Sequence, residues 1–176
     1  MMFKLAGPWG GPVRKILESI GLGALAALVW ITWSALLGPD RLPARIPTHF
    51  SLAGRPDDWG SPFVLLLVPA LAVAIYLLIS AVERSPRSFN LPAFPEHLPA
   101  RNRPRLKALA LDMVAWLKME LACFFAGIQW GSVQEFRHPR DTFPLALMPA
   151  ALVVIFATAG WFIGSIFRAG RAASGL

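Results

Sequence analysis

Four apolar runs constrain this 176-residue chain more than any other feature. They cover residues 16–37, 63–82, 106–132 and 144–167. Each approaches or exceeds the roughly 20 residues that a helix needs to cross a bilayer core. The mean hydropathy of +0.54 is too high for an ordinary soluble domain of this size. The runs predict an all-α fold: an integral membrane bundle of four transmembrane helices over residues 16–168, with tails at 1–15 and 169–176.

Basic residues are placed unevenly around these runs. They gather in three segments: residues 4–15 before the first run, 84–107 between the second and third, and 168–171 after the fourth. By the positive-inside rule, both termini are expected to be cytoplasmic and the protein to lie in the plasma (inner) membrane. The excess of 17 Lys and Arg over 10 Asp and Glu then reflects topology. Nucleic-acid binding is not expected, because no basic patch is interleaved with aromatic residues on a soluble module.

The expected partners follow from this topology. The bilayer itself is one, and the arginines of the segment between the second and third runs suit contact with anionic lipid or docking of a cytoplasmic protein. In the fourth run, Gly160 and Gly164 form a GxxxG pattern that favours close helix contact, within the bundle or between protomers. The oligomeric state is therefore not predicted. In the second run, Pro69 predicts a kink.

A polar, proline-rich segment, RLPARIPTHFSLAGRPDDWGSP (residues 41–62), separates the first two runs. Its prolines disfavour a helix because they restrict the residues before them to extended conformations. Residues 46–52 alternate between apolar and polar at strand period, and Ala53 to Pro56 supply turn chemistry before the chain returns. The segment predicts a short extracytoplasmic β-hairpin, with Ile46, Phe50 and Trp59 on its apolar side.

The hairpin carries the best outward-facing polar cluster, formed by His49, Asp57 and Asp58. Three interpretations stay open: hydrogen bonds that stabilise the hairpin, a contact with a peptide or small ligand that includes Phe50 and Trp59, and a divalent metal site. The bonding role is favoured, and no metal or cofactor is predicted. We also find no nucleophile elbow, zinc-protease motif, phosphate-binding glycine loop or cysteine pair. An enzymatic function is therefore not expected.

The third run is unusual because it contains the polar residues Asp112, Lys118, Glu120 and Gln129. An unpaired charge at mid-membrane costs at least about 2.5–3.5 kcal/mol, so these side chains should face the bundle or water. At 100° per residue, Lys118 shares a stripe with Gln129 and points away from Asp112 and Glu120. Lys118 therefore needs a partner from another element. The set is either an ion, proton or ligand site, or a group of paired and snorkelling side chains.

The hairpin segment resembles the bacterial membrane domain called domain of unknown function 1648. The residues that carry the resemblance are Leu42, Pro43, Ile46, Pro47, His49, Phe50, Gly54, Pro56, Asp57, Trp59 and Gly60. A looser similarity extends through Phe89, Asn90 and Pro92 to Trp116, Leu117, Lys118, Gln129 and Trp130. The domain also occurs in the SdpI family, known for immunity to a secreted toxic peptide coupled to capture of a repressor at the membrane. The resemblance thus implies an immunity or signalling role.

Three functions follow in order of preference. The first is a binding, immunity or signalling module without catalytic activity, whose outer loop meets a peptide, ligand or lipid. The second is a small transporter or channel component that uses Lys118 and Glu120 within the membrane. The third is a metal-dependent membrane enzyme, which requires bound metal at the outer cluster.

Overall fold

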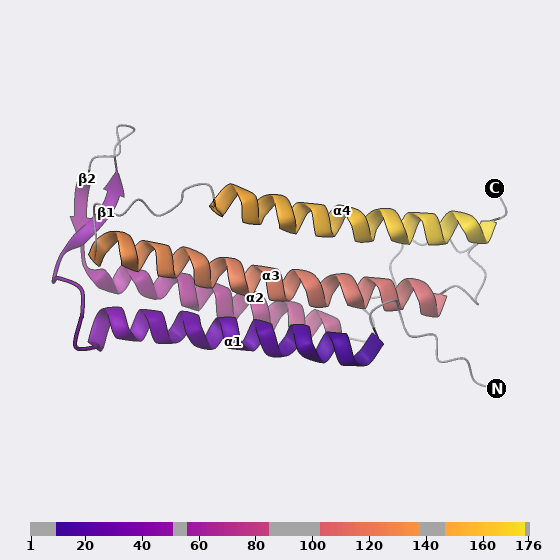
Figure 1. Ribbon diagram of the computed structural model, residues 1–176, viewed down its shortest axis with the longest axis horizontal. Helices are drawn as coiled ribbons and strands as arrows, with labels where there is room; N and C mark the ends of the chain where they lie inside the picture. Colours follow the sequence, from indigo (N-terminus) through magenta and orange to yellow (C-terminus); the bar gives the residue numbers. More distant parts are fainter. Residues whose placement is uncertain (1–9, 51–55, 85–102, 138–146, 175–176) are drawn as a thin grey trace.

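The computed structural model is a bundle of helices with a two-stranded hairpin at one end (Figure 1). It describes residues 10–50, 56–84, 103–137 and 147–174. The elements, in chain order, are α1 (Gly10–Leu37), β1 (Ile46–Phe50), β2 (Pro56–Gly60), the 3-10 helix η1 (Pro62–Leu66), α2 (Leu67–Arg84), α3 (Arg103–Arg137) and α4 (Leu147–Ser174).

The expected membrane character is confirmed by three of these helices. Residues 11–37, 62–84 and 148–169 are long and apolar enough to cross a bilayer. The helix α3 is not among them because charged residues interrupt its apolar sequence. Its 35 residues extend about 50 Å, well beyond the hydrocarbon thickness. A fourth membrane crossing by α3 stays a prediction.

α3 lies at the centre of the bundle, with its closest packing against α1, α2 and α4. Contacts between α1 and α3 follow the same order along both helices, from Arg14–Asp112 to Thr32–Gln129, so these two helices are parallel. α2 runs the opposite way. α4 packs chiefly on α3 and lies on the side away from α1 (Figure 1). Only 6% of its apolar window is buried.

The expected GxxxG contact of α4 is not formed with the part of the bundle that the structure describes. A Cβ atom built on Gly160 or on Gly164 would meet no atom within 4 Å. These two glycines therefore do not bring α4 close to α3.

The predicted hairpin is present. β1 and β2 pair antiparallel, with Ile46 opposite Gly60 and Pro47 opposite Trp59, and the register is irregular between Pro47 and Phe50. Gly60 is needed there, because a Cβ atom on it would lie 2.8 Å from the Thr48 methyl group. The expected turn, with Gly54, lies outside the described residues.

Local chemistry fixes the entry and exit of the hairpin segment. α1 ends at Leu37. The next residue is Gly38, where a Cβ atom would lie 2.5 Å from the Ser34 carbonyl oxygen, and Pro39 follows. On the other side, the Ser61 hydroxyl accepts a hydrogen bond from the Phe63 amide at the start of η1. α1 therefore ends, and η1 begins, at the boundary with the polar segment.

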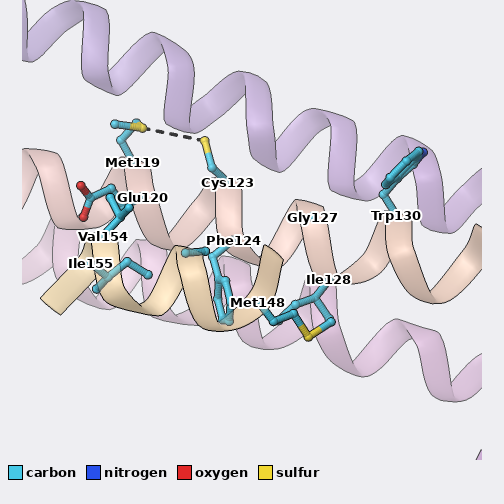
Figure 2. Close-up of a pocket in the computed structure, with 11 residues that line it drawn as sticks. Met119, Glu120, Cys123, Phe124, Gly127, Ile128, Trp130, Met148, Val154 and Ile155 are labelled. Carbon is cyan, nitrogen blue, oxygen red and sulfur yellow. Dashed lines mark hydrogen bonds between the residues drawn. The ribbon is translucent and has the colours of Figure 1, made fainter. Parts of the chain in front are cut away.

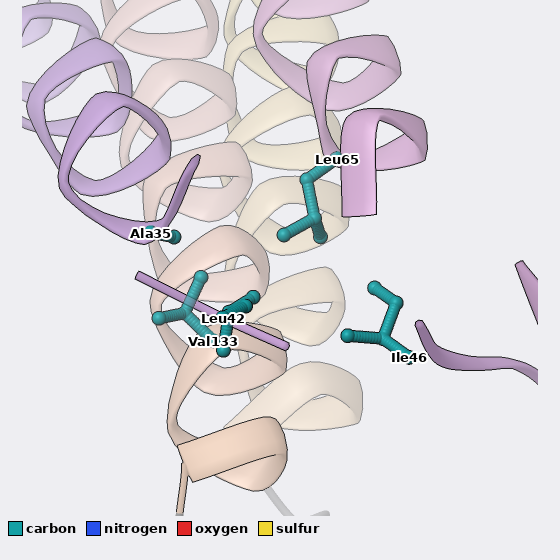
Figure 3. Close-up of a cluster of buried hydrophobic side chains, with 5 residues drawn as sticks. All are labelled: Ala35, Leu42, Ile46, Leu65 and Val133. Carbon is teal, nitrogen blue, oxygen red and sulfur yellow. The ribbon is translucent and has the colours of Figure 1, made fainter. Parts of the chain in front are cut away.

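A buried apolar cluster attaches the hairpin to the bundle (Figure 3). This hairpin anchor consists of Ala35, Leu42, Ile46, Leu65 and Val133, which come from α1, the following loop, β1, η1 and α3. Ile46 is 1% exposed. The Arg137 guanidinium also donates to the Asp40 carbonyl over 3.1 Å. The base of the hairpin is thus packed against three helical elements.

One expected feature of the hairpin is wrong. Trp59 does not share an apolar face with Ile46, because it is 53% exposed while Ile46 is buried. Trp59 is paired with Pro47, the neighbour of Ile46, so its side chain falls on the other side of the pleat. The aromatic ring is free for contact outside the bundle.

Replacing Ile46 with Ala should lower the free energy of unfolding by about 2–4 kcal/mol, because it opens a cavity in the hairpin anchor. Thermal unfolding of the purified protein in detergent would measure the loss. Ile20→Ala is the matched control, since Ile20 is 46% exposed on α1 and its truncation should cost under about 1 kcal/mol. Equal losses in the two variants would contradict the role of the cluster.

Candidate functional site

The polar side chains of α3 are the candidate site, and the structure shows a partner for each of them. Asp112, Lys118 and Gln129 are fully or nearly fully buried between α3 and its neighbours, at 0%, 3% and 0% exposure. Glu120 is partly buried and faces α4. The stripe of Lys118 and Gln129 predicted from the sequence is therefore the stripe that faces α1 and α2.

Lys118 has the partner that its position required. Its Nζ atom lies 2.6 Å from a Glu18 oxygen of α1 and 2.9 Å from a Glu83 oxygen of α2. It also donates to the Ser80 hydroxyl over 3.3 Å and lies 4.9 Å from the centre of the Tyr76 ring. Two carboxylates, a hydroxyl and an aromatic face thus surround one ammonium group.

The sequence alone did not reveal these partners. Glu83 lies just beyond the second apolar run, residues 63–82, whereas α2 continues to Arg84 and carries Glu83 within its last turn. Glu18 was within the first run, but only the packing of α1 against α3 places it beside Lys118. The signal that could have found both is charge balance, since a buried lysine requires a carboxylate nearby.

Asp112 forms a second ion pair, farther toward the start of α1. The Arg14 Nε atom lies 2.6 Å from Asp112 Oδ1, and the same guanidinium donates to the Ala108 carbonyl over 3.0 Å. The Asp112 side chain is fully buried and that of Arg14 is 28% exposed. The pair therefore places a charge-assisted contact at the α1–α3 interface.

Gln129 joins three helices near the hairpin. Its Nε2 atom donates to the Thr32 hydroxyl over 2.8 Å and to the Leu65 carbonyl over 3.1 Å. The Leu65 carbonyl lies four residues before Pro69, which has no N–H group to donate in return. The Gln129 amide thus satisfies an acceptor that the proline leaves open. Pro69 itself is in the first turn of α2.

Glu120 is separate from these groups. Its Oε1 atom accepts a hydrogen bond from the Thr158 hydroxyl of α4 over 2.7 Å. It does not contact Lys118, although the two are only two positions apart, because residues i and i+2 of a helix point in different directions. The hypothesis of one intramembrane site made by Lys118 and Glu120 together is therefore not supported by the geometry.

The hairpin brings His49 and Asp57 together. His49 Nδ1 lies 2.6 Å from Asp57 Oδ1, and their side chains are 69% and 44% exposed. Asp58 instead accepts a hydrogen bond from the Trp59 amide over 2.8 Å. Among the described residues, no group of three or more His, Cys, Asp or Glu side chains is placed to hold a metal ion. The side chain of Phe50 lies outside the described part.

Together these observations define a class: a helical membrane protein with a buried polar helix and a hairpin mounted on its end. Residues 24–73 match the family described as "Domain of unknown function (DUF1648)". The matched range runs from α1 through the hairpin into α2, and it confirms the family that the hairpin segment resembles. The whole hairpin segment, residues 41–62, therefore lies within the matched range.

The chain is also similar to a relative whose function is not described. The chain is 41% identical over 88 residues to an "Uncharacterized protein" of Archaeoglobus fulgidus. The match covers 46% of this chain and 46% of that relative, so less than half of the relative's length is spanned. No solved structure matches the chain.

Exchanging Gln129 for Leu should cost about 1–3 kcal/mol of unfolding free energy, because the buried Leu65 carbonyl loses its donor. Pro69→Ala supplies an N–H group four residues after Leu65. The cost of Gln129→Leu should therefore be smaller when it is made in Pro69→Ala than in the wild type. A double-mutant cycle of thermal unfolding measures this coupling. Fully additive costs would show that the amide does not serve the proline-freed carbonyl.

We expect Lys118→Met to destabilise the protein by about 1–3 kcal/mol, because it leaves two neighbouring carboxylates without a counter-charge. The cost is below that of a fully buried pair, since Glu18 and Glu83 are 36% and 24% exposed. Adding Glu18→Gln and Glu83→Gln should restore part of the loss in the same unfolding assay. Lys107→Met, at an exposed position of α3, is the control. Ion pairing would be excluded if the added substitutions worsened the loss.

Proposed function

We propose that the protein is a non-catalytic binding module of the plasma membrane, with an immunity or signalling role. In this proposal, the hairpin contacts a peptide, small ligand or lipid on the outer side. Both termini are cytoplasmic, in keeping with the basic residues of the segments around the apolar runs. The likeness to the SdpI family motivates the immunity role.

One observation carries this proposal: the hairpin has a buried base and an exposed outer part. Ile46 is packed into the hairpin anchor, whereas His49, Asp57 and Trp59 are exposed. An exposed tryptophan beside a polar pair is typical of residues that dominate binding to a partner. The His49–Asp57 contact holds the imidazole in one place, which lowers the entropy lost on binding.

The buried base of the hairpin also suggests how binding at the hairpin would change the opposite end of the bundle. The hairpin anchor includes Ala35 of α1, Leu65 of η1 and Val133 of α3. A partner that moved the hairpin would therefore move the ends of all three helical elements. The expected readout is a change at the opposite end of the bundle, where the arginine-rich segment between the second and third runs would dock a cytoplasmic protein.

Loss of the Trp59 ring should abolish protection against a toxic peptide while leaving the bundle intact. Sensitive bacteria expressing wild type, Trp59→Ala or His49→Ala at matched membrane levels would be exposed to a panel of membrane-active peptides. Truncating a dominant aromatic contact should lower the highest peptide concentration that the cells survive by about 30-fold or more. Trp33→Ala, at an exposed α1 position, is the matched control and should protect like wild type.

Two outcomes would reject the immunity role. One is a wild-type protein that protects against none of the peptides. The other is equal protection by wild type and both hairpin variants, which would place the effect away from His49 and Trp59.

A further inference from the structure

A groove of about 390 Å³ runs between α3 and α4 (Figure 2). Its walls are apolar apart from one carboxylate. The lining residues are Met119, Glu120, Cys123, Phe124, Gly127, Ile128, Trp130, Met148, Ala151, Val154 and Ile155. The volume lies within the range of roughly 300–1,000 Å³ that small-molecule sites occupy. The groove therefore has the size and the surface of a site for an apolar ligand.

The carboxylate of Glu120 is incompletely bonded at this groove. Its Oε1 atom accepts from Thr158, but its Oε2 atom is buried and has no hydrogen-bond partner in the described structure. The ion pairs found among the described residues involve Asp112, Lys118 and His49, and none of them includes Glu120. A buried carboxylate oxygen without a donor is unfavourable. Glu120 Oε2 therefore lacks one hydrogen-bond donor at the wall of the groove.

We propose that this groove binds an amphipathic amine, with its ammonium group on Glu120 and its aliphatic chain along the α3–α4 groove. An ammonium ion supplies up to three hydrogen bonds and the missing positive charge. A fatty acid would place a second negative charge beside Glu120, and an alkane would leave Oε2 unbonded. An ammonium group supplies both the missing hydrogen bond and a charge opposite to that of the carboxylate, whereas a neutral alcohol supplies only the hydrogen bond.

The walls suit a flexible chain. Met119 and Met148 line the groove, and thioether side chains adapt to irregular ligands. Gly127 keeps the middle open, since a Cβ atom built on it would meet nothing within 4 Å. Phe124 and Ile155 supply apolar surface from the two helices. An alkyl chain could therefore lie along the groove without displacing the backbone.

The position of Glu120 along α3 favours a single-chain amine over an ordinary phospholipid. Glu120 is midway between Arg103 and Arg137, about 25 Å from either end of α3. A phosphate headgroup at this depth would be far from water. A single-chain amine brings only the charge that Glu120 neutralises. None of the residues that line the groove belongs to the hairpin, so the site stands apart from the function proposed above.

Photo-crosslinking tests the proposal directly. The full chain in lipid nanodiscs would be labelled with a dodecylamine that carries a diazirine in its chain, and the modified residues mapped by mass spectrometry. Labels should concentrate on residues 119–130 and 148–155. Excess dodecylamine should remove them, whereas dodecanol should not. Glu120→Gln should lower the competable labelling about tenfold or more, because it removes a charge-assisted contact.

A second variant tests the groove without changing the carboxylate. Gly127→Leu fills the open middle and should abolish the competable labelling. Gly23→Leu is the matched control, because Gly23 of α1 is equally open and lies outside the groove. Comparable thermal stability of the variants would show that they fold. Competable labelling that is unchanged in Glu120→Gln or Gly127→Leu, or that dodecanol also removes, would overturn the proposal.

Discussion

The burial of the Lys118 ammonium between carboxylates of two other helices is the constraint on which the arrangement of the bundle depends. An unpaired charge inside an apolar bundle is costly, so α1 and α2 must present Glu18 and Glu83 at the depth of Lys118. The Arg14–Asp112 pair adds a contact of opposite polarity between α1 and α3. If α1 slipped by one turn, Glu18 would replace Arg14 beside Asp112. Charge thus fixes axial register where apolar packing alone permits sliding.

Part of this structure was predictable from sequence. Helix locations followed from the apolar runs, and the hairpin followed from its prolines and its strand-period alternation, because both signals are local. The face on which Trp59 lies was not predicted, because it depends on which β1 residue pairs with Trp59, and the alternation within each strand does not determine that cross-strand register.

The candidate site was predictable only in outline. Lys118 was recognised as needing a partner, but Glu83 was assigned to a loop because the end of α2 leaves no sharp signal before the proline-rich segment. Gln129 is visible in the sequence as a polar residue of the third run. Its hydrogen bond, however, goes to the Leu65 carbonyl, which Pro69 of a different helix leaves without a donor. The Thr158–Glu120 contact joins residues 38 positions apart, and a lone hydroxyl in an apolar run carries no pairing signal. Such contacts are set by helix register, which sequence periodicity does not determine.

The order of the charged partners along the chain has a consequence for biogenesis. Arg14, Glu18 and Glu83 all precede Asp112 and Lys118, so α1 and α2 leave the ribosome before α3 does. α3 falls below the apolar threshold that the other three helices meet. The counter-charges of α3 are therefore already in place on the two earlier helices when α3 is made. A chain with the same helices in reverse order would present the polar helix to the bilayer first, before any of its partners had been made.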